Sequence, residues 1–235
     1  SGLWAFTADG ANNKPFHAGY AVMSGLTAVK LAESGMTGPS KIIEAKDGGL
    51  YKATSVDYNV EEISYGLGQN FKIMEISQKP FACCRSMHPA IEAVLTLRDQ
   101  HQFQLEDILD IQVDTYKVAK LQCGQIVCPT STNEAKFSMP FGIAVALVDG
   151  QAFVEQFSED KFRDECILSL AKKVSGNVSE PFDSVYPYNW GCRVTIRLLN
   201  GQRLQVTVPD AKGDPTKPLT SNELEEKFFN LSSKT

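Results

Sequence analysis

The sequence has 235 residues, of which 43% are hydrophobic and 22% are charged, and its formal net charge is −5. This composition can fill a sizeable core and excludes wholesale disorder, while the length accommodates one large domain or two modest ones. An acidic balance without a basic run argues against nucleic-acid binding, no apolar stretch approaches the roughly 20 residues of a membrane helix, and the first residues lack the charged start of a signal peptide. We therefore expect a cytoplasmic protein.

The first predicted element is a helix over residues 15–34. Pro15 suits a first turn, and Gly35 suits the residue that follows a helix. Apolar residues recur at approximately helical spacing, namely Ala18, Val22, Leu26, Val29 and Leu31. Small residues crowd the same stretch, which indicates close packing against other helices, a burial that we do not expect this chain to provide by itself.

The pattern after this helix is mixed. A short helix is expected over residues 40–46, followed by a glycine-rich loop region over 47–69. Residues 71–76 alternate between apolar and polar and predict a strand. Residues 88–98 are amphipathic and predict a helix, and residues 108–116 alternate again and predict a second strand.

Two longer helices are predicted in the next part of the chain. Residues 134–149 are strongly apolar and end at Gly150, with Pro140 tolerable only near a helix start or at a kink. Residues 159–174 follow Ser158, which can cap a helix N-terminus.

The C-terminal part predicts a hairpin and a last helix. Residues 192–199 and 203–208 flank Asn200-Gly201, which favours a two-residue hairpin turn. The helix over residues 219–231 opens at Thr220, and a glutamate three residues later can complete a capping box.

This order of elements predicts an α+β fold, in which a lid-like α+β domain is flanked by helices that belong to an all-helical domain. We expect residues 1–69 to be the remnant of the helical domain and residues 70–210 to form the α+β domain. Residues 211–235 would then form a helix that returns to the helical domain.

The six cysteines predict reduced thiols rather than a metal site or a disulfide framework. They form no Cys-x-x-Cys pair and have no histidines at zinc-ligand spacing. Cys83 and Cys84 are adjacent, which is poor geometry for an ordinary disulfide. The expected compartment is therefore a reducing one.

A first cationic segment opens the N-terminal helix. Lys14 and His17 bracket the helix start, where free N–H groups and the helix dipole favour anions. Lys14 adds a full positive charge and His17 a donor whose charge can be tuned. The alternative on spacing alone is a solvated lysine and a capping histidine.

A second segment, Lys79 to Pro89, concentrates more chemistry. Lys79, Cys84, Arg85 and His88 lie within ten residues and again lead into a predicted helix. A polycarboxylate ligand requires several cations, and arginine can grip a carboxylate with two parallel hydrogen bonds. The alternative is a loop whose cysteines fill core space and whose Arg85 pairs with a surface acid.

These segments resemble the MmgE/PrpD family, which includes 2-methylcitrate dehydratase, cis-aconitate decarboxylase and iminodisuccinate epimerase. The resemblance rests on four blocks in family order across nearly the whole chain. The blocks are Lys-Pro-Phe-His-Ala-Gly-Tyr-Ala from Lys14, Lys-Pro-Phe-x-x-Cys-Arg-x-x-His-Pro-Ala-Ile from Lys79, Phe-Ser-Met-Pro-Phe-Gly-Ile-Ala from Phe137, and Gly-Asp-Pro from Gly213 with the helix after it.

The resemblance implies a helical domain and a smaller α+β lid with the active site between them, in a homodimer. It implies a lyase of the 2-methylcitrate dehydratase type in propionate metabolism, acting on a small di- or tricarboxylate without an iron–sulfur cluster, another metal or a cofactor. Such chemistry requires cationic clamps for the carboxylates and a positioned acid–base pair.

Residue by residue, the resemblance assigns Lys14 and Lys79 to substrate carboxylates. Cys84 stands where decarboxylases of the family place an active-site histidine, which argues against decarboxylation and leaves the role of this position open. Arg85 is a candidate anion ligand. His17 and His88 are either substrate-binding residues or polar scaffold.

The family's catalytic aspartate and further histidines come from helices upstream of Lys14. We therefore expect this chain to be a fragment or one half of a split enzyme, inactive alone, whose partner is the missing N-terminal helical half. Two alternatives stay open: an epimerase of an amino-dicarboxylate, or a non-catalytic lid or dimerisation module.

Overall fold

The computed structural model describes residues 2–3, 5–7 and 11–233. The chain forms two compact units, each described by itself. Unit 1 consists of Gly2 and Asn13–Glu75, and unit 2 consists of the described residues of Leu3–Asn12 and Ile76–Thr235. The predicted division at 69/70 and 210/211 stays a prediction, and its outer limits at residues 1 and 235 lie outside the described residues.

Unit 1 is dominated by one long helix, α1 (Lys14–Glu33), which confirms the first predicted helix. None of its residues is buried, and its apolar residues are spread around the helix rather than gathered on one face. A helix of this kind is ordinarily enclosed by other elements. The rest of unit 1 contains α2 (Leu50–Thr54) and the 3₁₀ helices η2 (Val60–Ile63) and η3 (Lys72–Glu75).

Two predicted elements of this region are wrong. Residues 40–46 form hydrogen-bonded turns rather than a helix. Residues 71–76 form no strand; most of the stretch is η3 (Lys72–Glu75), with Met74 N–H donating to the carbonyl of Phe71. A strand needs a neighbouring strand for its backbone groups, and the sheet of the described chain lies in unit 2. The backbone groups of this segment therefore form local hydrogen bonds instead.

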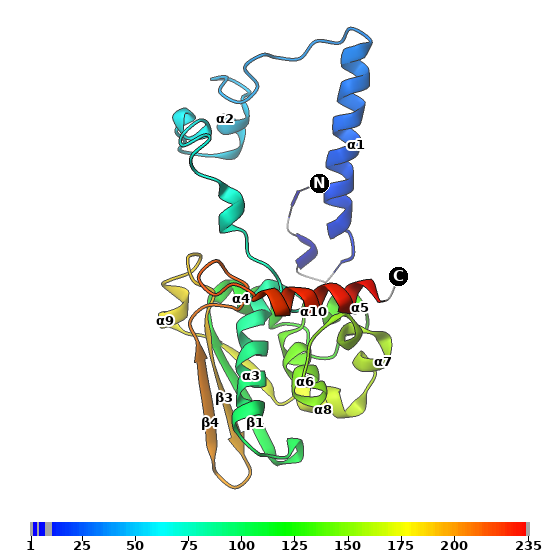
Figure 1. Ribbon diagram of the computed structural model, residues 1–235, viewed down its shortest axis with the longest axis vertical. Coiled ribbons are helices and arrows are strands. Elements are labelled where there is room, and N and C mark those ends of the chain that lie inside the picture. The colour runs from blue at the N-terminus through cyan, green and yellow to red at the C-terminus, as the bar shows by residue number, and fades with distance from the viewer. Residues whose placement is uncertain (1, 4, 8–10, 234–235) are drawn as a thin grey trace. The chain divides into compact units, whose positions relative to one another are not determined.

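Unit 2 is built on a four-stranded mixed sheet with the order β2-β1-β3-β4 (Figure 1). The strands are β1 (Ile108–Thr115), β2 (Val174–Val178), β3 (Cys192–Leu198) and β4 (Arg203–Val208). β1 pairs in parallel with β2 and antiparallel with β3, and β3 pairs antiparallel with β4. Val113 lies opposite Val194, which lies opposite Val206, so branched side chains meet across the sheet.

Helices cover the sheet and complete the core. α3 (His88–Gln100) packs against β3, β4 and α6 (Met139–Asp149), and α6 packs against α8 (Glu165–Ala171). The remaining helices of unit 2 are α4 (Lys117–Cys123), α5 (Thr132–Ala135), α7 (Glu159–Phe162), α9 (Glu180–Asp183), α10 (Ser221–Ser232), η1 (Ala5–Thr7), η4 (Arg85–Met87), η5 (Leu105–Asp107) and η6 (Val154–Phe157).

Each of the two longer predicted helices is split in two. Ser138 interrupts the first between α5 and α6, where its hydroxyl accepts a hydrogen bond from Phe141 N–H and caps α6, with Pro140 in the first turn. Asp164 interrupts the second, because its carboxylate accepts from two backbone N–H groups at the start of α8. Val174 does not extend that helix but begins β2, where it pairs with β1.

The hairpin is confirmed, but its predicted two-residue turn is wrong. Leu198 N–H donates to the carbonyl of Gln202, which closes a three-residue loop. Gly201 has φ 86°, a conformation that favours glycine. The capping box of α10 is confirmed: Thr220 and Glu223 each accept from the other's backbone N–H.

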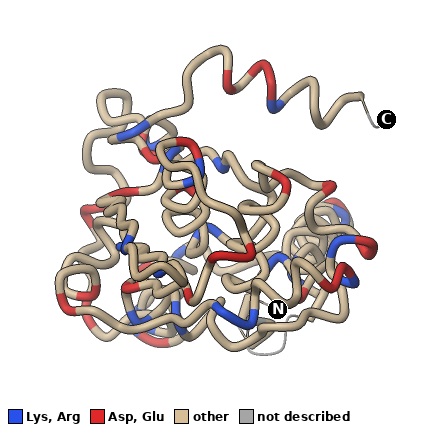
Figure 2. Tube along the Cα trace, turned by 90° about the horizontal axis from the view of Figure 1, so that it is seen from below, with Lys and Arg blue, Asp and Glu red and all other residues tan. Residues whose placement is uncertain are grey.

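The mixed sheet and its covering helices confirm the predicted α+β fold class. Figure 2 shows lysine and arginine residues interspersed with aspartate and glutamate along the described trace. None of the helices in the described part of the chain combines the length and apolar character that crossing a bilayer requires.

Candidate functional site

The segment from Lys79 to Pro89, hereafter the site segment, runs along unit 2 before it enters α3. Three backbone hydrogen bonds fix this stretch of chain: Gln78 N–H to Gly213, Ala82 N–H to Ala152, and Cys84 N–H to Lys136. Cys84 is extended and η4 begins directly after it. The segment is therefore held in place by backbone groups from distant parts of the chain.

Lys79 places an ammonium group over the site segment. Its side chain donates to the carbonyl of Cys83 at 3.0 Å, and its own carbonyl accepts from Lys227 Nζ at 2.8 Å. Among the described residues, Lys79 forms no ion pair with a carboxylate. Its positive charge is thus available to an anionic ligand.

Lys136 is a second lysine beside the same segment, and sequence reasoning missed it. Its charge and that of Lys79 both favour ionisation of the Cys83 thiol, although burial outweighs them and raises the pKa of that thiol. Lys136 likewise forms no ion pair with a carboxylate in the described chain. No motif marks this residue, so only the fold reveals it.

Arg85 is engaged by protein groups on two sides. Its guanidinium group forms an ion pair with Asp214 and lies 4.1 Å from the centroid of the Trp190 ring. The Asp214 side chain is only 4% exposed, so the partner is a buried acid rather than the surface acid of the alternative interpretation. Burial, followed by the neighbouring Asp210, raises the pKa of Asp214.

Cys84 belongs to a cluster of thiols and polar side chains. Its Sγ lies 3.9 Å from Gln122 Oε1, and Gln122 also accepts a 3.1 Å hydrogen bond from Ser86. A hydrogen bond from the Cys123 thiol lowers the pKa of Cys84 to about 6 against the effect of burial, and Ser86 and Lys79 add to the lowering. The same hydrogen bond, together with burial, raises the pKa of Cys123.

His88 begins α3 and is 1% exposed. Burial, followed by the nearby charge of Lys79, lowers its pKa to about 3, so the ring is neutral at physiological pH. It packs edge-on against Phe81 at 5.3 Å between ring centroids, and its Nε2 has no hydrogen-bond partner among the described residues. His88 therefore offers a neutral imidazole rather than a cationic clamp.

The predicted residues fall into both units. Unit 2 groups Lys79, Cys84, Arg85 and His88 at the entrance to α3. Lys14 and His17 lie in unit 1 on the first turn of α1, where His17 Nδ1 accepts from Gly2 N–H at 3.1 Å. Besides Lys136, five residues of the unit 2 site escaped sequence reasoning because their contacts are long-range: Ser86, Gln122, Cys123, Trp190 and Asp214.

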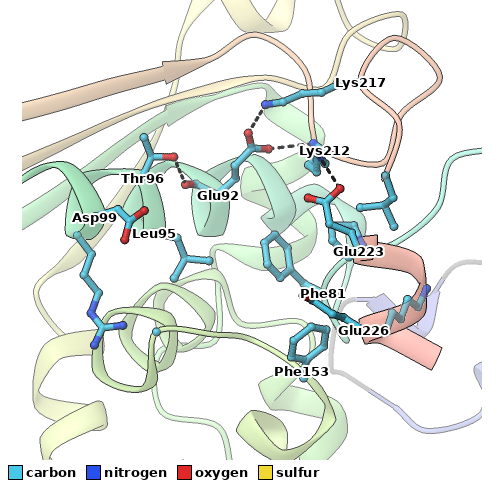
Figure 3. A pocket seen from close by; sticks show the side chains of 15 residues that line it. Phe81, Glu92, Leu95, Thr96, Asp99, Phe153, Lys212, Lys217, Glu223 and Glu226 are labelled. Carbon is cyan, nitrogen blue, oxygen red and sulfur yellow. Dashed lines mark hydrogen bonds and ion pairs between the residues drawn. The ribbon is translucent and has the colours of Figure 1, made fainter. Parts of the chain in front are cut away.

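A cavity of about 520 Å³ adjoins the start of the site segment, which contributes Pro80 and Phe81 to its wall, and neither Lys79 nor Cys84 lines it (Figure 3). Its apolar wall includes Phe81, Leu95 and Phe153, and its polar wall contains two ion pairs, Lys217 with Glu92 and Lys212 with Glu223. Figure 3 shows Glu92 facing both Lys217 and Lys212, the second through its backbone N–H, while Lys212 Nζ reaches Glu223 at 3.0 Å. Because these charges neutralise one another, Lys79 and Cys84 form the better candidate site.

Comparison with known protein families identifies the family of this chain. Residues 81–235 match the MmgE/PrpD C-terminal domain, and residues 1–63 match the MmgE/PrpD N-terminal domain. The chain belongs to the MmgE/PrpD family. The site segment begins two residues before the C-terminal domain match, and its residues from Phe81 onward lie within that match.

Curated MmgE/PrpD relatives are named as decarboxylases. The chain is 28% identical to cis-aconitate decarboxylase of Aspergillus terreus over 229 residues, covering 91% of this chain and 46% of the relative. It is 27% identical to human cis-aconitate decarboxylase, covering 94% and 46%. It is 25% identical to the cis-aconitate decarboxylase-like protein oryM of Aspergillus oryzae, covering 99% and 50%. The chain thus spans about half the length of these relatives.

Proposed function

We propose that this chain supplies the carboxylate-binding part of a lyase that acts on a small di- or tricarboxylate. The observation that carries the proposal is the position of Lys79, whose ammonium group lies over the site segment and has no carboxylate partner in the described chain. Lys136 adds a second unpaired charge beside the same segment. Two such cations favour a ligand with more than one carboxylate.

The remaining groups fit chemistry next to a carboxylate. Cys84 has a pKa of about 6, so its thiolate can accept a proton at neutral pH and return it. His88 is neutral and can hydrogen-bond without adding charge. Arg85 is immobilised by Asp214 and Trp190, which suits it to position the site segment. By family resemblance we keep Lys14 and His17 of unit 1 as candidate substrate-binding residues.

Elimination of water from 2-methylcitrate is our first candidate reaction. Decarboxylation of cis-aconitate is the second, because the curated relatives carry that name. The thiol of Cys84 stands where decarboxylases of the family place a histidine, and this difference favours the dehydratase. We also propose a cytoplasmic homodimer, as the resemblance implies.

Carboxylate binding tests the role of Lys79. Titration calorimetry of the chain with citrate should show that Lys79→Ala weakens binding at least tenfold, which is about 1.4 kcal/mol. Lys172→Ala is the matched control, since Lys172 is an exposed lysine without an ion pair at the end of α8. Equal affinities of the Lys79→Ala variant and the unaltered chain would remove the proposed site.

The same titration ranks the substrates. We expect 2-methylcitrate to bind more tightly than cis-aconitate, and the reverse order would favour the decarboxylase. We expect the chain alone to turn over neither compound, because the proposed catalytic partner residues belong to a further helical part that would also enclose α1. Robust loss of water from 2-methylcitrate by the purified chain would contradict this expectation.

A further inference from the structure

The cavity of unit 2 has no part in the function proposed above. Its volume is about 520 Å³, and its lining comes from α3, α10, the loop after α6 and the loop before α10. Figure 3 shows Phe81, Leu95 and Phe153 close to one another, and Leu219 also lines the cavity. A volume of this size with an apolar wall is typical of small-molecule sites.

α10 forms one side of the cavity through two side chains that are one helical turn apart. Glu223 and Lys227 line the cavity and are half-buried, whereas the other residues of α10 are exposed. Lys212 Nζ reaches Glu223 at 3.0 Å, and Lys227 Nζ donates to the carbonyl of Lys79 at 2.8 Å. A ligand in the cavity would therefore contact α10 and α3 at once.

The charges of the lining leave one half-buried cation without a counter-charge. Glu92 pairs with Lys217, and Glu223 pairs with Lys212. Lys227 has no carboxylate partner in the described chain, and it uses one of its three ammonium donors on a backbone carbonyl. The other charged residues of the lining are exposed, namely Arg98, Asp99 and Glu226. The cavity therefore combines an apolar wall with an available ammonium group.

We propose that this cavity binds a small monocarboxylate with an apolar body. The body packs against Phe81, Leu95 and Phe153, and the carboxylate accepts a hydrogen bond from the Lys227 ammonium group. A ligand with several carboxylates fits less well, because Glu92 and Glu223 line the same cavity and repel further negative charge. The ligand class thus differs from the di- or tricarboxylate of the proposed function.

Three probes of similar shape test the chemistry of the cavity: phenylacetate, phenethyl alcohol and phenethylamine. Each is titrated into the full chain at neutral pH, and binding is followed by ligand-observed NMR. We expect phenylacetate to bind about tenfold more tightly than the alcohol, because only the carboxylate pairs with Lys227. The amine should bind no better than the alcohol. Equal affinities for all three probes, tightest binding of the amine, or no binding of phenylacetate would overturn the proposal.

A charge variant tests the role of Lys227. Lys227→Met keeps an unbranched apolar side chain and removes the ammonium group, so phenylacetate should bind about tenfold more weakly while the affinity for phenethyl alcohol stays the same. Lys172→Met is the matched control, since Lys172 is an exposed lysine at the end of α8. Phenylacetate affinity in the Lys227→Met chain equal to that of the control would contradict the proposed contact.

A second variant tests the apolar wall. Leu95→Ala should weaken phenylacetate and phenethyl alcohol alike, by about fourfold, because both lose the same apolar contact. Leu121→Ala is the matched control, since Leu121 is an exposed leucine of α4 outside the lining. Phe153→Ala removes a different part of the wall and serves if the Leu95→Ala chain does not fold. Affinities as high as those of the control would rule out the cavity as the binding site.

Lys79→Ala separates this cavity from the site of the proposed function. Lys79 does not line the cavity, and the substitution keeps the backbone carbonyl that accepts from Lys227. The variant should therefore bind phenylacetate as tightly as the unaltered chain. Loss of phenylacetate binding would place the probe at the site segment and overturn the separate site. Unchanged citrate affinity with retained phenylacetate binding would instead remove the proposed function alone.

Discussion

Asp214 forms an ion pair with Arg85, which lies 129 residues earlier in the chain. The carboxylate is almost fully buried and the guanidinium group is 27% exposed, so neither charge is freely solvated. This pair therefore does two things: it neutralises the arginine of the site segment, and it fixes that segment to the loop before α10.

Removing the carboxylate of Asp214 should lower the stability of the folded chain. We expect Asp214→Asn to destabilise the chain by about 3 kcal/mol, because the partly buried guanidinium group loses its counter-charge. Urea unfolding measures the change. The control is Arg163→Gln, which breaks the ion pair of Arg163 with Glu159, where both side chains are mostly exposed. A cost for Asp214→Asn no greater than that of the control would show that the pair is not structural.

Acid should destabilise the chain through His88. Its folded pKa of about 3 lies below the ordinary value of 6.5, so the unfolded chain binds the proton more readily and stability is lost as pH falls through this window. Between pH 7 and pH 5 we expect a loss of about 2 kcal/mol from this group.

Two histidine variants isolate this contribution to the pH dependence. His88→Gln should flatten the dependence of the unfolding free energy on pH between 7 and 5, whatever its effect at pH 7. His101→Gln, at an exposed position, should leave the slope unchanged. The same slope in both variants would mean that His88 does not titrate as its burial predicts.

Gly213 should resist substitution. It has φ 92°, and a Cβ there would lie 1.8 Å from the carbonyl oxygen of Gln78. We expect Gly213→Ala to cost at least about 2 kcal/mol and to loosen the backbone bond that precedes the site segment. Gly176→Ala is the control, since nothing lies within 4 Å of the Cβ position at Gly176. Thermal unfolding distinguishes the two, and equal midpoints would contradict the close approach.

Ser138 should matter for the stability of the fold. Its hydroxyl caps α6 and also donates to the carbonyl of Ile126, in a fully buried position. We expect Ser138→Ala to cost about 2 kcal/mol without changing citrate affinity. Ser131→Ala removes the cap of the short, exposed α5 and should cost less. Reduced citrate affinity in a folded Ser138→Ala chain would assign this serine to the site instead.

Local signals in the sequence were sufficient for several elements. Pro15 and Gly35 delimit α1, the capping box of Thr220 identifies the start of α10, alternation predicts β1, and Asn200-Gly201 marks the hairpin that contains β3. The strand predicted over residues 71–76 failed because a strand needs a neighbour that no local pattern supplies. The same limit explains the long predicted helix that Ser138 divides.

The site was predictable in its parts but not in its pairings. The spacing of Lys79, Cys84, Arg85 and His88 marked the site segment, and the family blocks agreed with it. No spacing rule joins Arg85 to Asp214 or Cys84 to Gln122, since these contacts depend on the sheet and helices between them. Burial likewise decides the charge of His88, which the sequence pattern leaves open.

The contacts of the site segment also set an order on its assembly during translation. The segment is synthesised before Gly213, Asp214 and Lys227, which bind it or the residue before it. A nascent chain must therefore carry Lys79 and Arg85 without these partners until Gly213, Asp214 and Lys227 have been synthesised. A messenger truncated before Gly213 would encode every residue of the segment and still leave it without its anchors.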